Sequence, residues 1–162
     1  MKNITMIAAV GKNLELGKNN DLIWHFKEDL SFFRDQTINK PVVMGMKTLK
    51  SLPKLLPKRK HIVLTRQNVE LPEEIVVIHS KEDLLKYIEE YGEEVMIIGG
   101  ASVYEQMLEY SEKLILTEID AEDKEADCYF PAFNKDEWNQ EVVSSHTEND
   151  INYKHLVYTR KG

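Results

Sequence analysis

The sequence predicts an α/β domain in which helices cover both faces of a mostly parallel sheet. Short apolar runs alternate with helical patterns along most of the 162 residues, as in strands joined by crossover helices. After residue 113 the strand-like runs follow one another without helices, which favours an antiparallel end to the sheet. We therefore expect a three-layer sandwich with a single domain over residues 1–162, a length typical of one domain.

The first part of the chain supplies a strand, a loop, a helix and a second strand. Residues 4–10 are apolar and predict a buried strand, whereas residues 11–21 are polar, rich in glycine and asparagine, and predict a loop. A helix is expected over residues 27–37. Pro41 then opens a strand that ends at Gly45.

The middle of the chain continues this alternation. A short helix is expected to begin near Met46, and β-branched runs at residues 61–65 and 75–78 predict two strands. Ser80 fits the N-cap of the next helix, because its hydroxyl can accept a hydrogen bond from the first turn. Gly92 fits the end of that helix.

The last part of the chain begins with a buried strand, expected at residues 95–98, that leads through Gly99 and Gly100 into a helix ending at Leu108. Three later strands are expected at residues 114–119, 140–145 and 153–159. The last two are expected to form an antiparallel pair that closes the sheet edge.

Composition and charge exclude several classes of protein. The chain has 21 Lys and Arg against 28 Asp and Glu, a net charge of −7, which argues against a nucleic-acid partner. Its single cysteine, Cys128, excludes an internal disulfide and multi-cysteine metal sites, and we expect no metal. No apolar run approaches the roughly 18 residues of a membrane span, and residues 4–10 do not fit a signal peptide. A cytoplasmic protein without a membrane partner is expected.

Common catalytic motifs are missing from the sequence, including G-x-S-x-G, H-E-x-x-H and a G-x-G-x-x-G after a strand. The segment Gly45-Met46-Lys47-Thr48 is similar to the end of a phosphate-binding P-loop. Met46 stands where that loop needs its second glycine, and the leading glycine is also missing, which disfavours a P-loop. Cys128 lacks a partner at catalytic spacing and is interpreted as a packed small residue.

One acidic residue stands out in the helix expected at residues 27–37. Phe26, Leu30 and Phe33 are spaced to form an apolar stripe, which places Asp29 on or beside the face that should be buried. One interpretation is a first-turn acid favoured by the helix dipole. The other is a carboxylate at the bottom of an apolar pocket, where it would bind a flat, N–H-rich ring by paired hydrogen bonds.

Three predicted strand ends carry glycine or basic residues. They are the segments Gly45-Met46-Lys47-Thr48, Thr65-Arg66 and Gly99-Gly100-Ala101-Ser102. In open α/β sheets, ligands bind outside the carboxyl ends of the strands, near helix N-termini that attract phosphate. The glycines alone would fit tight turns, but three such corners with basic residues favour a dinucleotide or polyphosphate cleft.

Several segments match a known family in order and spacing. In the first half of the chain they are Ile7-Ala8-Ala9, residues 16–22 with Trp24, Glu28-Asp29-Leu30 with Phe33 and Arg34, and residues 40–45, 56–60 and 62–66. In the second half they are residues 97–104, 116–119 and 127–131. Through these segments the chain resembles bacterial dihydrofolate reductase along nearly its whole length.

The resemblance implies an eight-stranded, mostly parallel sheet with an antiparallel C-terminal strand and four flanking helices. The implied activity is the NADPH-dependent reduction of 7,8-dihydrofolate to tetrahydrofolate. The expected partners are this small-molecule substrate and antifolate inhibitors, and the expected state is a monomer.

The resemblance also implies roles for individual residues around the substrate. Asp29 takes the place of the ionisable group in the pterin pocket, with Thr117 as its hydroxyl partner and Trp24 ordering a nearby water. These three are the expected catalytic residues. Other implied substrate-binding residues are Ile7, Ala8, Leu30, Phe33, Leu56, Arg59, Ile98 and Tyr104. Arg59 matches the arginine that pairs with the substrate α-carboxylate; the alternative is a solvated loop charge.

For the cofactor, the resemblance implies a nicotinamide flanked by Ala9, Leu16 and Tyr104, and a 2′-phosphate that contacts Thr65 and Arg66. The other implied NADPH-binding residues are Gly17, Gly45, Met46, Lys47, Thr48, Leu64, His79, Ile98, Gly99, Gly100, Ala101, Ser102 and Val103. Residues 11–23 would form a lid over the site.

The chain departs from the family pattern at several positions. Met46 replaces an arginine that contacts cofactor phosphate in most members, and Ile23 and Lys27 replace two prolines beside the lid. None of these changes removes a catalytic group, so we expect activity with altered cofactor affinity. Two alternatives stay open: a related pteridine or pyrimidine reductase, against which Arg59 argues, and a non-catalytic nucleotide-binding module.

Overall fold

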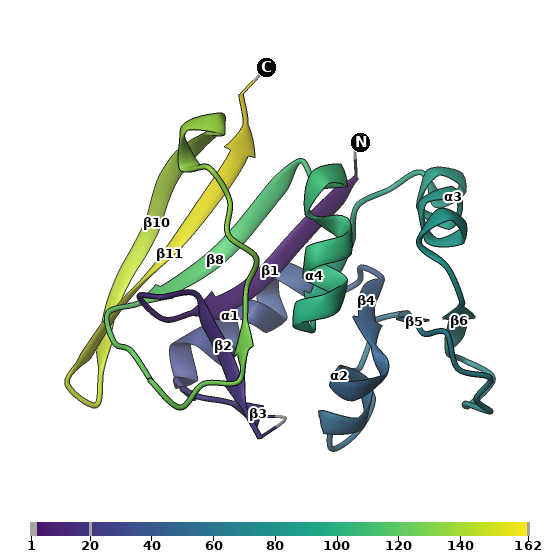
Figure 1. Ribbon diagram of the computed structural model, residues 1–162, viewed down its shortest axis with the longest axis horizontal. Coiled ribbons are helices and arrows are strands. Elements are labelled where there is room, and N and C mark those ends of the chain that lie inside the picture. Colours follow the sequence, from purple (N-terminus) through teal and green to yellow (C-terminus); the bar gives the residue numbers. More distant parts are fainter. Residues whose placement is uncertain (1–2, 20, 162) are drawn as a thin grey trace.

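A twisted eight-stranded sheet runs through the centre of the computed structural model, which describes residues 3–19 and 21–161 (Figure 1). Its strands are β1 (Ile4–Val10), β4 (Val42–Gly45), β5 (His61–Leu64), β6 (Val76–Ile78), β7 (Val95–Gly99), β8 (Lys113–Ile119), β10 (Trp138–Glu148) and β11 (Ile151–Arg160). They lie in the order β10-β11-β8-β1-β7-β4-β5-β6. β11 runs antiparallel to both of its neighbours, β10 and β8, and the other pairs of these strands are parallel. The predicted fold class is confirmed.

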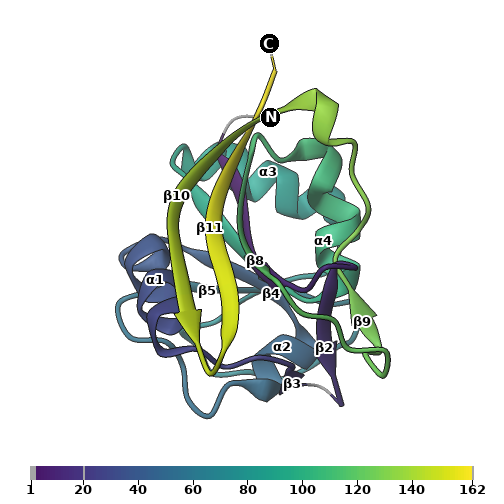
Figure 2. The ribbon, with the colours of Figure 1, turned by 90° about the vertical axis from the view of Figure 1, so that its left-hand side faces the viewer.

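Helices cover both faces of this sheet (Figure 2). They are α1 (Lys27–Thr37), α2 (Met46–Ser51), α3 (Lys81–Tyr91) and α4 (Ala101–Met107), with 3-10 turns η1 (Leu108–Tyr110) and η2 (Lys135–Glu137). One apolar cluster of the sheet packs against Phe33 of α1 and Leu49 of α2, and we call this side the α1 face. The other cluster includes Leu84 of α3 and Met107 of α4 and forms the α4 face. No described helix is long and apolar enough to cross a membrane.

Local signals account for the ends of α3. The Ser80 side chain accepts a hydrogen bond from the Asp83 N–H at 3.1 Å, and Gly92 adopts the left-handed conformation with φ 78°. Both residues act as predicted, because a serine cap satisfies a free N–H and glycine adopts positive φ without strain. These two signals set the length of the helix.

The prediction of a simple loop over residues 11–21 is wrong. This segment contains β2 (Glu15–Lys18) and β3 (Asp21–Leu22), which pair with each other, and β2 also pairs with β9 (Cys128–Tyr129). The buried carboxylate of Glu15 accepts hydrogen bonds from the N–H groups of Asn13 and Asp123. These contacts hold the segment extended against a distant loop. Asn20, part of the family-like segment, lies outside the described residues.

Candidate active site

Asp29 lies in the first turn of α1 and contacts the sheet. The buried Thr117 of β8 donates a 2.5 Å hydrogen bond from its hydroxyl to Asp29 Oδ1. The Asp29 side chain is only 16% exposed. Alternation along β8 explains the contact, because Ile115 packs on the α1 face and Thr117, two residues later, points the same way. The structure therefore brings the predicted acid and its predicted hydroxyl partner together.

Leu30 does not join the buried stripe that the sequence predicts on α1. Its side chain is 55% exposed, whereas Phe26, just before the helix, is buried and Phe33 is half-buried against the sheet. Thr37 is the only fully buried residue of α1, so the helix contacts the sheet closely at its C-terminal end and leaves its first turn partly open. An acid and an apolar side chain thus stand together where a ligand can reach them.

Apolar side chains predicted to surround the substrate gather on the α1 face. Ile7, Phe33, Leu56 and Ile98 all belong to, or pack against, one cluster on that face. Ala8 does not, because strand alternation turns its side chain to the α4 face. Only its backbone is available to a ligand on the α1 face.

The loop between α2 and β5 carries Arg59, which is half-buried. Its Nη1 donates to the Pro57 carbonyl at 3.3 Å and its Nη2 to the Arg34 carbonyl at 3.4 Å. Its Nε is buried and has no hydrogen-bond partner among the described residues. Burial and the Arg34 guanidinium lower the pKa of Arg59. A buried donor without a partner is costly, and a carboxylate ligand would satisfy it.

His61 is a functional candidate that sequence reasoning missed. It is buried at the start of β5, where its Nε2 accepts from the Leu56 N–H at 3.0 Å and its Nδ1 donates to the Arg59 carbonyl at 3.1 Å. Burial lowers the pKa of His61, an effect that the hydrogen bond to Arg59 partly opposes and the Arg59 charge adds to. A neutral ring therefore fixes the loop that carries two predicted substrate residues. Nothing in the local sequence identifies this contact.

The carboxyl ends of β7, β4 and β5 are neighbours in the sheet, so the three predicted phosphate corners come together. A Cβ added at Gly99 would lie 3.3 Å from Thr48 Oγ1, and one added at Gly100 would lie 3.4 Å from the same atom. Gly99 also has φ +131°, which side chains rarely adopt, and Lys47 is exposed beside this gap. The glycines leave a narrow backbone cradle that fits a polyphosphate.

The outer corner of this edge contains the residues predicted to meet a 2′-phosphate. His79 Nδ1 lies 2.9 Å from the Thr65 carbonyl oxygen, which joins the end of β6 to the end of β5. Arg66 follows and is exposed, whereas Leu64 is buried. A cation and a hydroxyl are thus available for an anion at this corner.

Helix α4 contributes to the site mainly through its first residues. Ala101 is half-buried and Ser102 is exposed, whereas Val103 and Tyr104 are buried in the cluster of the α4 face. The Tyr104 hydroxyl donates a 2.6 Å hydrogen bond to the Ile7 carbonyl, and burial raises the pKa of this phenol. Packing and this hydrogen bond therefore hold the Tyr104 side chain in one position.

Met46, the first residue of α2, is half-buried. Its side chain packs against the α1-face cluster. The positive charge at the end of β4 therefore comes from the neighbouring Lys47. The departure from the family pattern at this position is therefore accommodated as an apolar contact.

The predicted lid is held closely against the loop that leads to β9. The Asn19 N–H donates to Asp127 Oδ2 at 2.9 Å, and the Asp127 N–H donates to the Gly17 carbonyl at 3.0 Å. The hydrogen bond from Asn19 is the main reason that the pKa of Asp127 is lowered. A Cβ at Gly17 would lie 2.8 Å from the Asp21 carbonyl oxygen, and Leu16 packs on the α4 face.

Two further predicted positions lie where the lid meets α1. The ring of Trp24 packs against the cluster of Phe26, Ile119 and Tyr153, as does Ala9.

Cys128 in β9 is half-buried. Burial, followed by its hydrogen bond to Asp127, raises the pKa of the thiol. A raised pKa disfavours the thiolate, in line with its interpretation as a packed residue.

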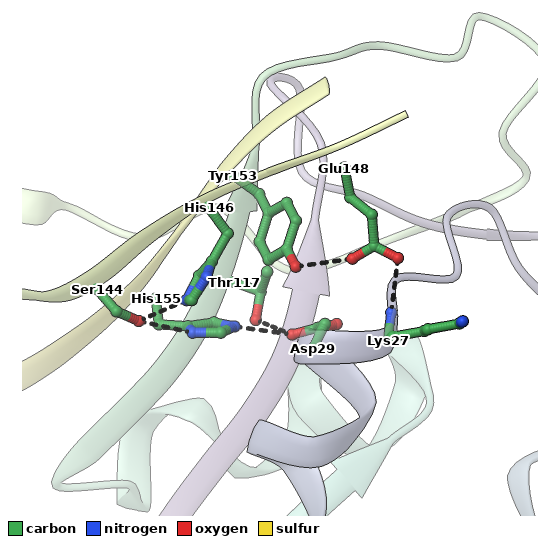
Figure 3. A network of polar contacts seen from close by, with 8 residues as sticks. All are labelled: Lys27, Asp29, Thr117, Ser144, His146, Glu148, Tyr153 and His155. Carbon is green, nitrogen blue, oxygen red and sulfur yellow. Dashed lines mark hydrogen bonds and ion pairs between the residues drawn. The ribbon is translucent and has the colours of Figure 1, made fainter. Parts of the chain in front are cut away.

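A second group of polar side chains extends from Asp29 into the sheet, and the sequence did not predict it (Figure 3). His155 of β11 is 2% exposed, and its Nε2 lies 3.1 Å from Asp29 Oδ1. Beside it, the Tyr153 hydroxyl donates to Glu148, whose carboxylate also accepts from the Lys27 N–H. Burial is the main reason that the pKa of Tyr153 is raised.

The fold and these sites define a nucleotide-binding α/β enzyme with an acid, Asp29, that contacts strand β8 of the sheet. Comparison with known proteins identifies the family. The sequence model of the dihydrofolate reductase family matches residues 3–160. The chain is 37% identical to dihydrofolate reductase from Haemophilus influenzae over 97% of this chain and 98% of that protein. It is 35% identical to the one from Bacillus subtilis, over 98% and 95%.

A solved structure agrees with these matches. Dihydrofolate reductase from Enterococcus faecalis, in complex with NADP(H) and RAB-propyl, superposes with a TM-score of 0.87 at 28% identity and covers 98% of this chain. This chain covers 96% of that structure. The chain belongs to the dihydrofolate reductase family, and the predicted family, enzyme class and NADPH cofactor are confirmed.

Proposed function

We propose that this chain reduces 7,8-dihydrofolate to 5,6,7,8-tetrahydrofolate with NADPH, and so supplies one-carbon and thymidylate metabolism. The observation that carries the proposal is the Asp29–Thr117 pair beside apolar side chains at the open end of α1. NADPH supplies a hydride from nicotinamide C4 to pterin C6 when it is bound. The residues of the chain bind both molecules, exclude water and direct one proton to N5.

In this proposal Asp29 anchors the pterin ring. Its Oδ1 accepts from Thr117, whereas its Oδ2 has no hydrogen bond to any described residue. That oxygen is left to accept from the 2-amino group and N3 of the ring. The same carboxylate helps direct the proton that reaches N5, with Trp24 ordering the water beside it, and such acid catalysis contributes about 10²- to 10⁴-fold.

Arg59 would bind the α-carboxylate of the substrate tail. Its buried Nε without a partner supports this role, because a planar guanidinium matches a carboxylate with two parallel hydrogen bonds. Antifolates that share the ring and the tail would use the same groups. This arginine is also the reason to prefer a folate over a simpler pteridine or a pyrimidine.

The residues at the carboxyl edge fit the cofactor. Lys47, Thr48 and the backbone of residues 99–103 would hold the pyrophosphate, and Thr65, Arg66 and His79 would bind the 2′-phosphate. The lid over residues 11–23 would exclude water during the reaction. We further infer a cytoplasmic monomer without a nucleic-acid or membrane partner.

The test follows NADPH absorbance with purified protein and dihydrofolate. We expect saturable turnover on the order of 1–10³ s⁻¹, and a much higher KM for NADH, which lacks the 2′-phosphate. A dihydropterin without the glutamate tail should show a raised KM, because it does not engage Arg59. NADPH binding without turnover would contradict the proposal and favour a nucleotide-binding module.

A further inference from the structure

A chain of hydrogen bonds leads from the Asp29 carboxylate to side chains of the sheet (Figure 3). His155 Nε2 lies 3.1 Å from Asp29 Oδ1, and His155 Nδ1 lies 3.0 Å from Ser144 Oγ. The same Ser144 oxygen lies 3.0 Å from Nε2 of His146. Four side chains from α1, β11 and β10 are thus connected.

Strand register brings these side chains together. Thr117 of β8 pairs with His155 of β11, which in turn pairs with Ser144 of β10. Residues directly opposite one another point to the same face of a sheet, so all three face α1. The His155 ring stacks on Phe32 with centroids 3.8 Å apart and planes within 5°. Register and stacking together leave the ring little freedom.

For a neutral His155 ring, the chemistry of the partners determines which nitrogen carries each proton. An ionised carboxylate only accepts hydrogen bonds, so His155 Nε2–H donates to Asp29. A neutral ring then leaves Nδ1 as the acceptor for the Ser144 hydroxyl. The Ser144 oxygen in turn accepts from His146 Nε2–H. Every donor in the chain therefore points toward Asp29.

We propose that His155 is a positioning residue for the reaction. Together with Thr117 it occupies Asp29 Oδ1 with two donors, so Oδ2 alone is presented to the substrate ring. Ser144 and His146 keep the His155 ring in the tautomer that this task requires. The identity of the substrate rests on the proposed function, whereas the hydrogen-bond chain is a property of the protein without ligand.

The outer end of the chain reaches solvent. His146 lines an open surface hollow of about 300 Å³ together with Asn152, Tyr153 and Lys154. The inner end is closed to solvent, because the His155 side chain is only 2% exposed.

This arrangement predicts an effect on the pH dependence of the rate. Asp29 of α1, His146 of β10 and Tyr153 of β11 lie next to the His155 ring, and Glu148 and Glu28 are the further acids near Tyr153. Reduction consumes a proton, so the rate falls as pH rises through the midpoint of its profile. A donor to a carboxylate favours its ionised form. Loss of the His155 N–H should therefore raise the midpoint of the kcat profile.

Two substitutions at one position separate positioning from packing. His155→Phe keeps a flat ring on Phe32 but removes both nitrogens, and we expect the kcat midpoint to rise by about half to one pH unit. His155→Gln places an amide donor near the position of Nε2 and should bring the midpoint back toward that of the native protein. A purely structural role would lower kcat equally at every pH, without rescue by glutamine, and that result would overturn the proposal.

The hydroxyl in the chain offers a matched control. Ser144→Ala should shift the midpoint in the same direction as His155→Phe, by a smaller amount, because the His155 tautomer is then no longer held. Ser145→Ala changes the neighbouring, exposed hydroxyl and should leave the profile unchanged. Equal effects of the two alanine variants would overturn the assignment of Ser144.

A second measurement does not depend on turnover. Nitrogen NMR of the imidazole rings in the unliganded protein should show His155 protonated at Nε2 near neutral pH. Asp29→Asn should shift the His155 signals and leave those of His79 in place. An Nδ1-protonated His155, or one insensitive to Asp29→Asn, would overturn the proposal. If the protein failed to reduce dihydrofolate while both NMR results held, the proposed function would fail, and only the hydrogen-bond chain from His146 to Asp29 would stand.

Discussion

The two oxygens of the Asp29 carboxylate have different partners. Oδ1 accepts from Thr117 and His155, whereas no described residue donates to Oδ2. A side chain that is anchored through one oxygen keeps the other in a fixed direction, which lowers the entropic cost of orienting a ligand. The first-turn position of Asp29 on α1 is therefore more than a favourable contact with the helix dipole.

Asp29→Asn should leave the fold intact and lower kcat by about 10²- to 10⁴-fold at pH 7, because an amide cannot take up and direct the proton. The measurement is NADPH oxidation at saturating dihydrofolate, with circular dichroism to confirm folding. Glu28→Gln is the matched control, since Glu28 is the adjacent, exposed acid and should keep native turnover. A near-native rate for Asp29→Asn would contradict the assignment.

Met46→Arg should strengthen NADPH binding. The apolar stem of an arginine can keep the contacts that Met46 makes with the α1-face cluster, while its guanidinium reaches the phosphate corner. We expect the Kd for NADPH to fall by about 5- to 30-fold, or about 1–2 kcal/mol. Calorimetry on the unliganded protein measures this change.

A matched variant tests whether position matters for this effect. Lys50→Arg changes an exposed cation at the far end of α2 and should leave the Kd unaltered. An unchanged Kd in Met46→Arg itself would mean that Lys47 already neutralises the phosphate.

Elements differ in how far local sequence determines them. The helix α3 is predicted from end to end because its signals, Ser80 and Gly92, act within the helix itself. The strand β2 is missed because its partner β9 lies far along the chain, and polar residues 11–21 show no strand periodicity. Strand pairing between distant segments is a tertiary property that local patterns do not record.

The same distinction applies to the site. Asp29 and Arg59 stand in segments that resemble a known family, so their places are predictable from sequence. His155 and His61 are missed for a physical reason. His155 reaches Asp29 only through the register of β11 on β8, and a shift by one residue would turn it to the other face.

His61 holds the loop between α2 and β5 in place through two hydrogen bonds, and His61→Leu should destabilise that loop. The Leu56 N–H would lose its acceptor, a loss of about 1–3 kcal/mol in the free energy of unfolding. Arg59 would be less well placed, so the KM for dihydrofolate should rise more than kcat falls. A dihydropterin without the glutamate tail is the control substrate, and its KM should change little. Equal effects on both substrates would contradict this role.

The carboxyl ends and the amino ends of the parallel strands have different roles. The carboxyl ends of β7, β4 and β5 carry the glycines and open corners of the ligand site, whereas the opposite end is tied together by Glu94. This carboxylate accepts from Thr5 Oγ1 at 2.5 Å and Lys40 Nζ at 2.8 Å, and lies 3.6 Å from Lys113 Nζ. Four adjacent strands, β8, β1, β7 and β4, therefore meet at one acid.

This acid should make stability depend on pH without affecting the site. Burial alone would raise the pKa of Glu94, but the hydrogen bonds from Lys40 and Thr5 and the charge of Lys113 outweigh it and lower the pKa. A lowered pKa means stabilisation that is fully present above about pH 4.5, the ordinary value, and is lost as pH falls below it.

Glu94→Gln should therefore lower the free energy of unfolding by about 1–2 kcal/mol at pH 7 and leave kcat and both KM values unchanged. Urea denaturation across pH measures this loss, which should shrink as pH falls well below 4.5 and the native glutamate itself becomes protonated. Glu93→Gln alters the exposed neighbour and should cost little at any pH. A loss that is the same at both ends of the pH range would mean that packing, and not charge, ties the strands together at Glu94.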